Sequence, residues 1–225
     1  MNLVLFDVCG TLIDGNSTQL YVDYLLGNGP VNFRAKHYKR WKTFFSLIAW
    51  IFRKFFHLDI TRFIIRKCFS GIKQEEIINL NKKFSSFYLK KLKNHEHFLI
   101  EKQKWKTIIL VSASIDPPIQ ILAEFLSVPY YASKLEQKNN ILTWSFTEDL
   151  QGRKESIFKD NRINLNDYKK ISFYTDNKED ISLISYLHKT KKLEKVNIIL
   201  LSQDDRLYRE HYFTSLKFTN YEYLS

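Results

Sequence analysis

The sequence has few cysteines and no long apolar run, and each absence excludes a class of protein. Among its 225 residues only Cys9 and Cys68 are cysteines, and they lie far apart in unrelated contexts. Two such cysteines do not form a disulfide framework or a zinc site, so we expect a cytoplasmic location. The longest uncharged apolar stretch, Phe44–Phe52, is ended by Arg53. Because a spanning helix needs about 20 such residues, we expect no simple transmembrane segment.

We also expect no secretory leader. The chain passes from Met1 almost directly into the apolar run Leu3–Phe6, which is too short for a signal-peptide core and is followed by Asp7. The six histidines show no spacing typical of metal ligands. Hydrophobic residues make up 44% of the chain and charged residues 26%, which is typical of a globular protein. The length suits one α/β domain with a modest insertion.

Acidic residues are scarce in one block of the sequence. Between Gly15 and Ile100 there are 16 Lys or Arg residues but only five acidic residues, so this block carries the whole formal excess of +11. The remainder of the chain is formally neutral. A charge confined to one block indicates that two parts of the chain face different surroundings.

Short apolar runs followed by polar turns predict buried parallel strands. Helical patterns such as Ile119–Leu126 and Asp180–Leu187 alternate with these runs. The alternation predicts an α/β fold with a doubly wound, mainly parallel sheet. The segment Lys134–Phe146 has a polar turn between alternating residues and predicts a hairpin at the sheet edge. The predicted strands are Leu3–Phe6, Thr107–Val111, Ile171–Tyr174 and Val196–Leu201.

The basic block interrupts this alternation directly after the first predicted strand. Residues 15–99 show no convincing strand, and their aromatic and aliphatic residues recur three and four positions apart, as in helices. We therefore predict an inserted α-helical cap over residues 15–99, with residues 1–14 and 100–225 forming the α/β core. Residues 207–225 give no pattern that assigns them a structure.

Polar residues stand at the ends of the predicted strands, where open parallel sheets bind their ligands. We expect a carboxylate, a hydroxyl, an ammonium group and two further carboxylates to converge there. In chain order they are Asp7 with Gly10-Thr11, then Ser112-Ala113-Ser114, then Lys154 after Gly152-Arg153, and finally Asp176 and Asp180.

These residue types suit phosphoryl transfer. A carboxylate such as Asp7 can attack phosphorus and form an aspartyl-phosphate. Magnesium, held by one or two carboxylates, supplies the positive charge that lets two anions approach. Lys154 and the Ser112 hydroxyl can hold the remaining phosphoryl oxygens. The constellation therefore predicts a magnesium-dependent reaction of a phosphate monoester.

In order and spacing, the four segments resemble the four motifs of the haloacid dehalogenase superfamily. The Ser112-Ala113-Ser114 form and the Asp176 and Asp180 pair are similar to its phosphoserine-phosphatase-like branch, in which a helical cap follows the first motif. The resemblance implies a phosphatase or phosphotransferase with Asp7 as the nucleophile. It also implies phosphate binding by Thr11, Ser112, Ala113 and Lys154, and magnesium binding by Asp7, the Cys9 backbone carbonyl, Asp176 and Asp180. Two roles stay open at this point: Thr11 binds phosphate or bonds locally, and Asp180 supports the metal or Lys154.

Cys9 departs from the pattern of these phosphatases, most of which carry a second catalytic aspartate at this position. A thiol, with an ordinary pKa of about 8.5, is a poorer acid and base near neutral pH. Three interpretations follow. The substrate, another side chain or solvent supplies the proton; or the enzyme is slow and has a long-lived intermediate; or the protein is a catalytically silent relative that binds phosphate.

The predicted cap mixes basic and aromatic residues in Arg34–Phe56 and again in Phe63–Phe69. Such mixtures are typical of helices that lie on anionic lipid, although packed cap helices with solvated lysines give the same pattern. With its Tyr/Phe-rich stretch Tyr21–Leu26 and its apolar segment, the predicted cap also resembles phosphatidylglycerophosphate-type lipid phosphatases. We therefore expect a lipid phosphate or another amphiphilic monoester as substrate, with peripheral contact to the inner face of the membrane. A small soluble monoester such as phosphoserine is the alternative, and nucleic acid is not an expected partner because no nucleic-acid module is present.

Overall fold

The computed structural model describes residues 1–28, 67, 69–104, 106–176, 180–190, 193–199 and 221–224. Most of the basic, aromatic stretch in the predicted cap lies outside these residues, as does most of the tail from residue 200. The predicted cap boundaries and the expected membrane contact therefore stay predictions. None of the described helices is long and apolar enough to cross a membrane.

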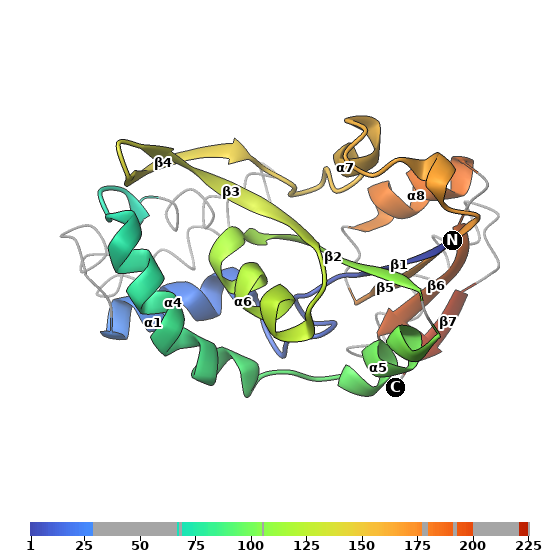
Figure 1. The fold of residues 1–225 in the computed structure, drawn as a ribbon, viewed down its shortest axis with the longest axis horizontal. Coiled ribbons are helices and arrows are strands. Elements are labelled where there is room, and N and C mark those ends of the chain that lie inside the picture. Colours follow the sequence, from blue (N-terminus) through green and yellow to red (C-terminus); the bar gives the residue numbers. More distant parts are fainter. Residues whose placement is uncertain are drawn as a thin grey trace, which may run out of the picture.

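The described strands form one sheet in the order β4-β3-β2-β1-β5-β6-β7 (Figure 1). All neighbouring strands are parallel except β3 and β4. From the central β1 the chain winds first to β2 and β3, and then returns to the other side of β1 to form β5 and β6. The predicted doubly wound α/β fold is confirmed. The strands are β1 (Asn2–Phe6), β2 (Thr107–Ile115), β3 (Tyr130–Lys138), β4 (Ile141–Glu148), β5 (Lys170–Thr175), β6 (Leu193–Ile199) and β7 (Tyr221–Leu224).

Helices cover both faces of the sheet, and successive side chains of β1 point to these two faces in turn. Val4 and Phe6 point into a core shared with α1, α4, α5 and α6, whereas Leu3 and Leu5 point into a second core shared with α7 and α8. Because both faces of β1 are buried, the strand is apolar throughout. The helices are α1 (Ser17–Asn28), α4 (Gln74–Leu89), α5 (His95–Gln103), α6 (Asp116–Leu126), α7 (Ser156–Lys159) and α8 (Ile181–Lys189), with a short 3₁₀ helix at Leu165–Asp167.

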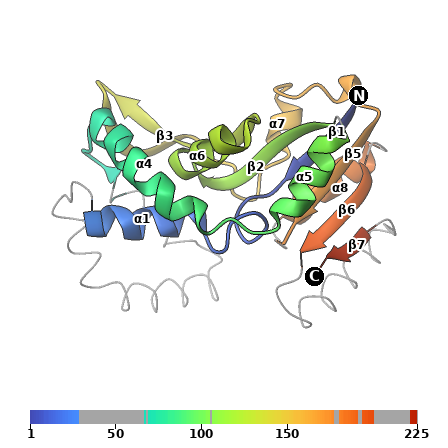
Figure 2. The ribbon, with the colours of Figure 1, turned by 60° about the horizontal axis from the view of Figure 1, so that its bottom comes forward.

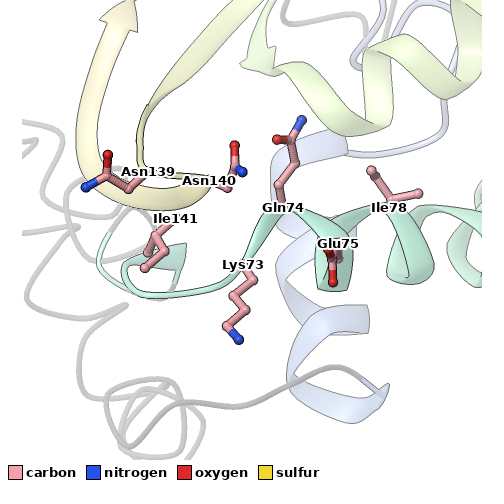
Figure 3. Close-up of a pocket in the computed structure, with 7 residues that line it drawn as sticks. All are labelled: Lys73, Gln74, Glu75, Ile78, Asn139, Asn140 and Ile141. Atoms are coloured by element: carbon pink, nitrogen blue, oxygen red, sulfur yellow. The ribbon is translucent and has the colours of Figure 1, made fainter.

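The predicted hairpin is confirmed as β3 and β4. Asn139 and Asn140 connect the strands with φ angles of 51° and 61°, the left-handed conformation that a two-residue type I′ turn requires. The turn reaches the start of α4, where the backbone N–H of Gln74 donates to the carbonyl of Asn140 at 2.9 Å. A pocket of about 490 Å³ lies at this junction (Figure 3) and includes Lys73 and Ile141 in its lining. None of the candidate catalytic residues lines it.

The strands differ from the prediction at three places. β6 begins at Leu193, three residues before the predicted start at Val196. β2 continues to Ile115, so Ser112, Ala113 and Ser114 lie within the end of the strand and not after it. The pairing of β2 with β3 shifts register between Val111 and Ile115, and this irregularity lets a polar stretch continue a buried strand. The described part of the tail, which the sequence left unassigned, forms the edge strand β7.

α1, α4 and α6 lie together at one end of the molecule, away from β6 and β7 (Figure 2). The side chain of Asn16 caps α1 by accepting the Gln19 backbone N–H at 3.0 Å, which starts the helix directly after the first loop. The loop that follows β1 therefore enters this helical group at once, and its residues contact both the sheet and the helices.

Candidate active site

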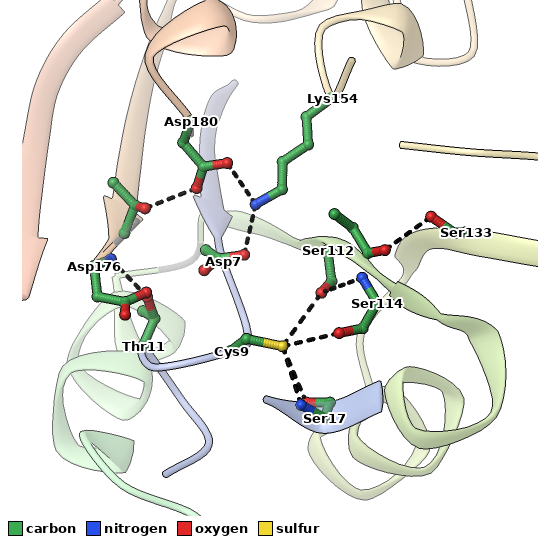
Figure 4. Close-up of polar contacts among 12 residues, drawn as sticks. Asp7, Cys9, Thr11, Ser17, Ser112, Ser114, Ser133, Lys154, Asp176 and Asp180 are labelled. Atoms are coloured by element: carbon green, nitrogen blue, oxygen red, sulfur yellow. Dashed lines mark hydrogen bonds and ion pairs between the residues drawn. The ribbon is translucent and has the colours of Figure 1, made fainter. Parts of the chain in front are cut away.

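The three predicted carboxylates meet at the carboxyl ends of two neighbouring strands (Figure 4). Asp7 directly follows β1 and Asp176 directly follows β5, which pairs with β1 in parallel. The Asp7 backbone N–H continues this pairing by donating to the Tyr174 carbonyl at 2.9 Å. Asp180 stands at the start of α8, and all three side chains are buried. The fold thus brings together acidic residues that lie about 170 positions apart in the sequence.

Lys154 lies between two of these carboxylates. Its Nζ donates to Asp7 Oδ1 at 2.6 Å and to Asp180 Oδ1 at 2.6 Å, and only 3% of the residue is exposed. Burial alone would lower the pKa of the Lys154 ammonium, but the charges of Asp180 and Asp7 outweigh it and raise this pKa. Lys154 is therefore held as a cation against Asp7.

Both oxygens of Asp180 already have partners. Oδ1 pairs with Lys154, and Oδ2 accepts a hydrogen bond of 2.7 Å from the Thr175 hydroxyl. Of the two roles left open by the sequence, this geometry favours support of Lys154 over direct metal binding.

Thr11 and Gly10 fix the position of Asp176. The Thr11 hydroxyl donates to Asp176 Oδ1 at 3.1 Å and accepts the Asp176 backbone N–H at 2.9 Å. Gly10 has a φ of +77°, and a Cβ added to it would lie 1.8 Å from Asp176 Oδ2. Only glycine allows the loop to adopt this conformation and to approach the carboxylate so closely.

The site holds more buried negative charge than its own residues neutralise. Three carboxylates face one ammonium group, and burial, aided by Asp180 and Asp176, raises the pKa of Asp7 although Lys154 opposes the change. Asp7 Oδ2 is buried and has no hydrogen-bond partner among the described residues. An unpaired, buried carboxylate oxygen beside a second carboxylate is the environment that a divalent cation with oxygen ligands requires.

The carboxylate oxygens of Asp7 and Asp176 suit magnesium, which needs few side-chain ligands. Within the described residues, no group of three or more His, Cys, Asp or Glu side chains forms a metal site by itself. Magnesium usually binds to one or two carboxylates and keeps several waters, so Asp7 and Asp176 would be sufficient as its side-chain ligands.

The end of β2 brings Ser112 to the same side of the sheet. Ser112 is buried, and its Oγ accepts the backbone N–H of Ser114 at 3.2 Å. Ser133 of β3 connects this strand end to the Lys154 segment, because its hydroxyl donates to the Ala113 carbonyl at 2.9 Å and accepts the Leu150 backbone N–H at 3.0 Å. Sequence reasoning missed Ser133, since no motif marks a serine in the middle of an edge hairpin.

Cys9 lies on the other side of the first loop, among hydroxyl groups. Its Sγ lies 2.9 Å from Ser114 Oγ and 3.3 Å from Ser17 Oγ. Burial, followed by the charge of Asp7, raises the pKa of the Cys9 thiol. Ser17 was also missed by sequence reasoning, because a serine at the start of a helix indicates no more than a cap.

A family model for haloacid dehalogenase-like hydrolases matches residues 4–185. The chain belongs to this family. The match confirms the superfamily that the four motifs resembled, and members of this family generally use magnesium. No curated protein matches the chain.

Solved structures with the same fold cover nearly the whole chain. A protein of unknown function from Bordetella pertussis Tohama I is 15% identical, with a TM-score of 0.75 over 100% of this chain and 98% of that one. Cytosolic 5′-nucleotidase IIIB, solved with cytidine bound, is 14% identical, with a TM-score of 0.67 over 99% and 79%. A phospho-aspartyl intermediate analogue of phosphoserine phosphatase is 18% identical, with a TM-score of 0.53 over 91% and 89%. At these identities the likeness establishes the fold.

Proposed function

We propose that this hydrolase is a magnesium-dependent phosphomonoester phosphatase that uses Asp7 as its nucleophile. One observation carries the proposal: Lys154 holds one oxygen of the Asp7 carboxylate, while the other oxygen is buried without a partner beside Asp176. A structural ion pair does not need a second, uncompensated oxygen, whereas a nucleophilic aspartate at a metal centre needs one oxygen for the cation in addition to the oxygen that attacks phosphorus.

Asp7 Oδ2 would bind magnesium together with Asp176 and the Cys9 backbone carbonyl. The bound cation supplies positive charge that offsets the repulsion between the carboxylates and a phosphate dianion. Asp180 would then hold Lys154 in place. Thr11 would hold Asp176 in place, because the single hydroxyl proton of Thr11 is already donated to Asp176. These assignments narrow the predicted ligand set to three groups and remove Thr11 from the predicted phosphate-binding groups.

The reaction would proceed in two displacements at phosphorus. A carboxylate oxygen of Asp7 forms a bond to phosphorus as the bond to the leaving oxygen breaks, and the leaving oxygen takes a proton from solvent because Cys9 replaces the usual acid. Water then attacks the aspartyl-phosphate, which releases inorganic phosphate and restores the carboxylate. Lys154, Ser112 and the backbone at Ala113 would hold the equatorial oxygens as charge builds on them.

Small phosphorylated molecules are the substrate class that the comparisons support. The similar folds include a phosphoserine phosphatase and a nucleotidase, although the low identities do not transfer their substrates. The basic block of the sequence predicts a lipid phosphate as substrate. A lipid phosphate therefore belongs among the substrates to be tested, because Arg34–Phe56 lies outside the described residues.

The proposal is tested by release of inorganic phosphate from p-nitrophenyl phosphate, phosphoserine, nucleoside monophosphates and a micellar lipid phosphate. Release should require magnesium, should stop with EDTA and should be abolished in Asp7→Asn. Asp14→Asn is the matched control, because Asp14 is an exposed aspartate on the same loop and should keep full activity. Full activity of Asp7→Asn would refute the assignment of the nucleophile.

A further inference from the structure

A chain of buried hydroxyl groups connects Cys9 to helix α4. The Cys9 thiol donates to Ser17 Oγ at 3.3 Å, and the Ser17 backbone N–H donates to Cys9 Sγ at the same distance. Ser17 Oγ shares a second hydrogen bond, of 2.7 Å, with the hydroxyl of Tyr88 near the end of α4. Hydrogen bonds thus link Cys9 of the first loop to Ser17 of α1, and Ser17 to Tyr88 of α4 (Figure 4 shows the Cys9 end).

The residues in this series of hydrogen bonds are held in place by burial and packing. Ser17 and Tyr88 are 0% exposed, and a buried hydroxyl that loses its hydrogen-bond partner destabilises the fold. The Tyr88 ring stacks on Phe84 at a centroid distance of 5.0 Å. Burial raises the pKa of the Tyr88 hydroxyl, which therefore keeps its proton and can either donate to Ser17 Oγ or accept from it. Tyr88 therefore holds Ser17 from a rigid position.

The main chain joins the same two regions separately. The Asp14 backbone N–H donates to the Lys91 carbonyl at 2.8 Å, and the Lys93 N–H donates to the Leu12 carbonyl at 2.8 Å. These bonds anchor the far end of the first loop, after Thr11. Backbone bridges from Cys9 to Ile13 and from Ile13 to Leu92 extend this main-chain link to the Cys9 backbone. The Cys9 side chain is held separately, by Ser17 from the helical side and by Ser114 of β2 at 2.9 Å.

We propose that Tyr88 is a positioning residue for the reacting end of the first loop. Through Ser17 it holds the Cys9 side chain, and with it the segment that carries Asp7 and the Cys9 carbonyl. The orientation of α4, a helix of the inserted region, is thereby coupled to the reacting centre. The kinetic consequence rests on the proposed phosphatase function, whereas the effect on Cys9 rests on the contacts alone.

Tyr21 offers a matched control for Tyr88. Its ring is also 0% exposed and also contacts Phe84 at 5.0 Å, and its hydroxyl also bonds between α1 and α4, to Asn81 Oδ1. The difference is that the Tyr21 bond does not lead to Cys9. Tyr21→Phe and Tyr88→Phe thus remove the same kind of bond from the same helix pair.

The first readout is kinetic. Tyr88→Phe should lower kcat for p-nitrophenyl phosphate by roughly 5–30-fold with little change in KM, because a misplaced loop slows the chemical step. Ser17→Ala should lower kcat by a similar factor. The double variant should have a kcat no lower than that of either single variant, because both residues act through the same series of hydrogen bonds. Tyr21→Phe should keep the kcat of the wild type. Equal kcat values for Tyr88→Phe and Tyr21→Phe would overturn the proposal.

The second readout does not need activity. In a Cys68→Ser background, alkylation of Cys9 by iodoacetamide should be about 5-fold faster in Tyr88→Phe than in Tyr21→Phe, as expected for the loss of one hydrogen bond. Equal labelling rates would contradict the positioning role even in an active phosphatase. If the wild type releases no phosphate but the labelling rates differ, the proposed function fails and the positioning role stands.

Discussion

The two sides of the first loop are built from different chemistry. On one side Asp7 faces Lys154, Asp176 and Asp180, and the contacts are short, charge-assisted and buried. On the other side Cys9 faces neutral hydroxyl groups at 2.9 to 3.9 Å. Charge-assisted bonds are about twice as strong as neutral ones. Under the proposed function the charged side would perform the chemistry, whereas the neutral side would set the geometry of the loop.

The largest expected effect follows from removing the cation of the charged side. Lys154→Met should lower kcat by roughly 1000-fold or more, because Lys154 both orients Asp7 and would hold a phosphoryl oxygen. It also leaves Asp7 and Asp180 without their shared partner. Phosphate-release assays check this, with Lys159→Met as an exposed control. A variant that keeps a tenth of the wild-type kcat would contradict the comparison.

The neutral side can be converted to the more common arrangement of the family by Cys9→Asp. The Ser17 N–H already donates to the sulfur, and the hydroxyls of Ser17 and Ser114 can turn to donate as well, so these groups suit a carboxylate better than a thiol. We expect kcat to rise about 10–100-fold if acid and base help limits turnover.

The control for this variant is Cys9→Ser, which keeps a small polar group but cannot act as a carboxylate. It should not exceed the wild type. An unchanged or lower kcat in Cys9→Asp would mean that the substrate, another side chain or solvent already supplies the proton, and that the neutral side has no chemical role.

Gly10→Ala should break the contact between the loop and Asp176. The added Cβ would meet Asp176 Oδ2 at 1.8 Å and would force a φ of +77° on alanine, so we expect a loss of about 2–4 kcal/mol in unfolding free energy and weaker binding of magnesium. Gly27→Ala in α1, where a Cβ meets no atom within 4 Å, should be neutral or slightly stabilising. Denaturant titration of each variant, with and without magnesium, measures the unfolding free energy and the stabilisation by bound magnesium. Equal stability of the two variants would be inconsistent with the observed packing.

Ser133→Ala gives the smallest effect. It removes one hydroxyl that bonds to the Ala113 carbonyl and the Leu150 N–H, so we expect a loss of about 1–2 kcal/mol in unfolding free energy and a modest fall in kcat. Ser85→Ala, which removes an exposed hydroxyl on α4, should change neither quantity.

Sequence reasoning located the charged side better than the neutral side, and the reason is physical. Asp7 and Asp176 end apolar strands, and parallel strands place their carboxyl ends at one edge, so their approach followed from topology. The partners of Cys9 come from the start of α1 and the end of α4, and the packing of two helices depends on side-chain shapes that no local pattern encodes. The role of Asp180 stayed open for a similar reason, since its choice between metal and lysine depends on distances.

The fold followed from the same local signals, with limits at its irregular points. Alternating apolar strands and helical patterns predicted the sheet, and the polar turn before Ile141 predicted the hairpin. The extension of β2 through Ser112 to Ile115 could not be predicted, because a polar run at a strand end normally indicates a loop and only the register shift against β3 allows it here.

The nucleophile itself is most directly tested by acid-quenching the enzyme during turnover of p-nitrophenyl phosphate with magnesium and locating the added phosphoryl group by peptide mass spectrometry. We expect a hydroxylamine-labile adduct on Asp7 that is absent without magnesium and absent in Asp7→Asn. Steady release of phosphate with the adduct on a different residue, or with Asp7→Asn as active as the wild type, would contradict it.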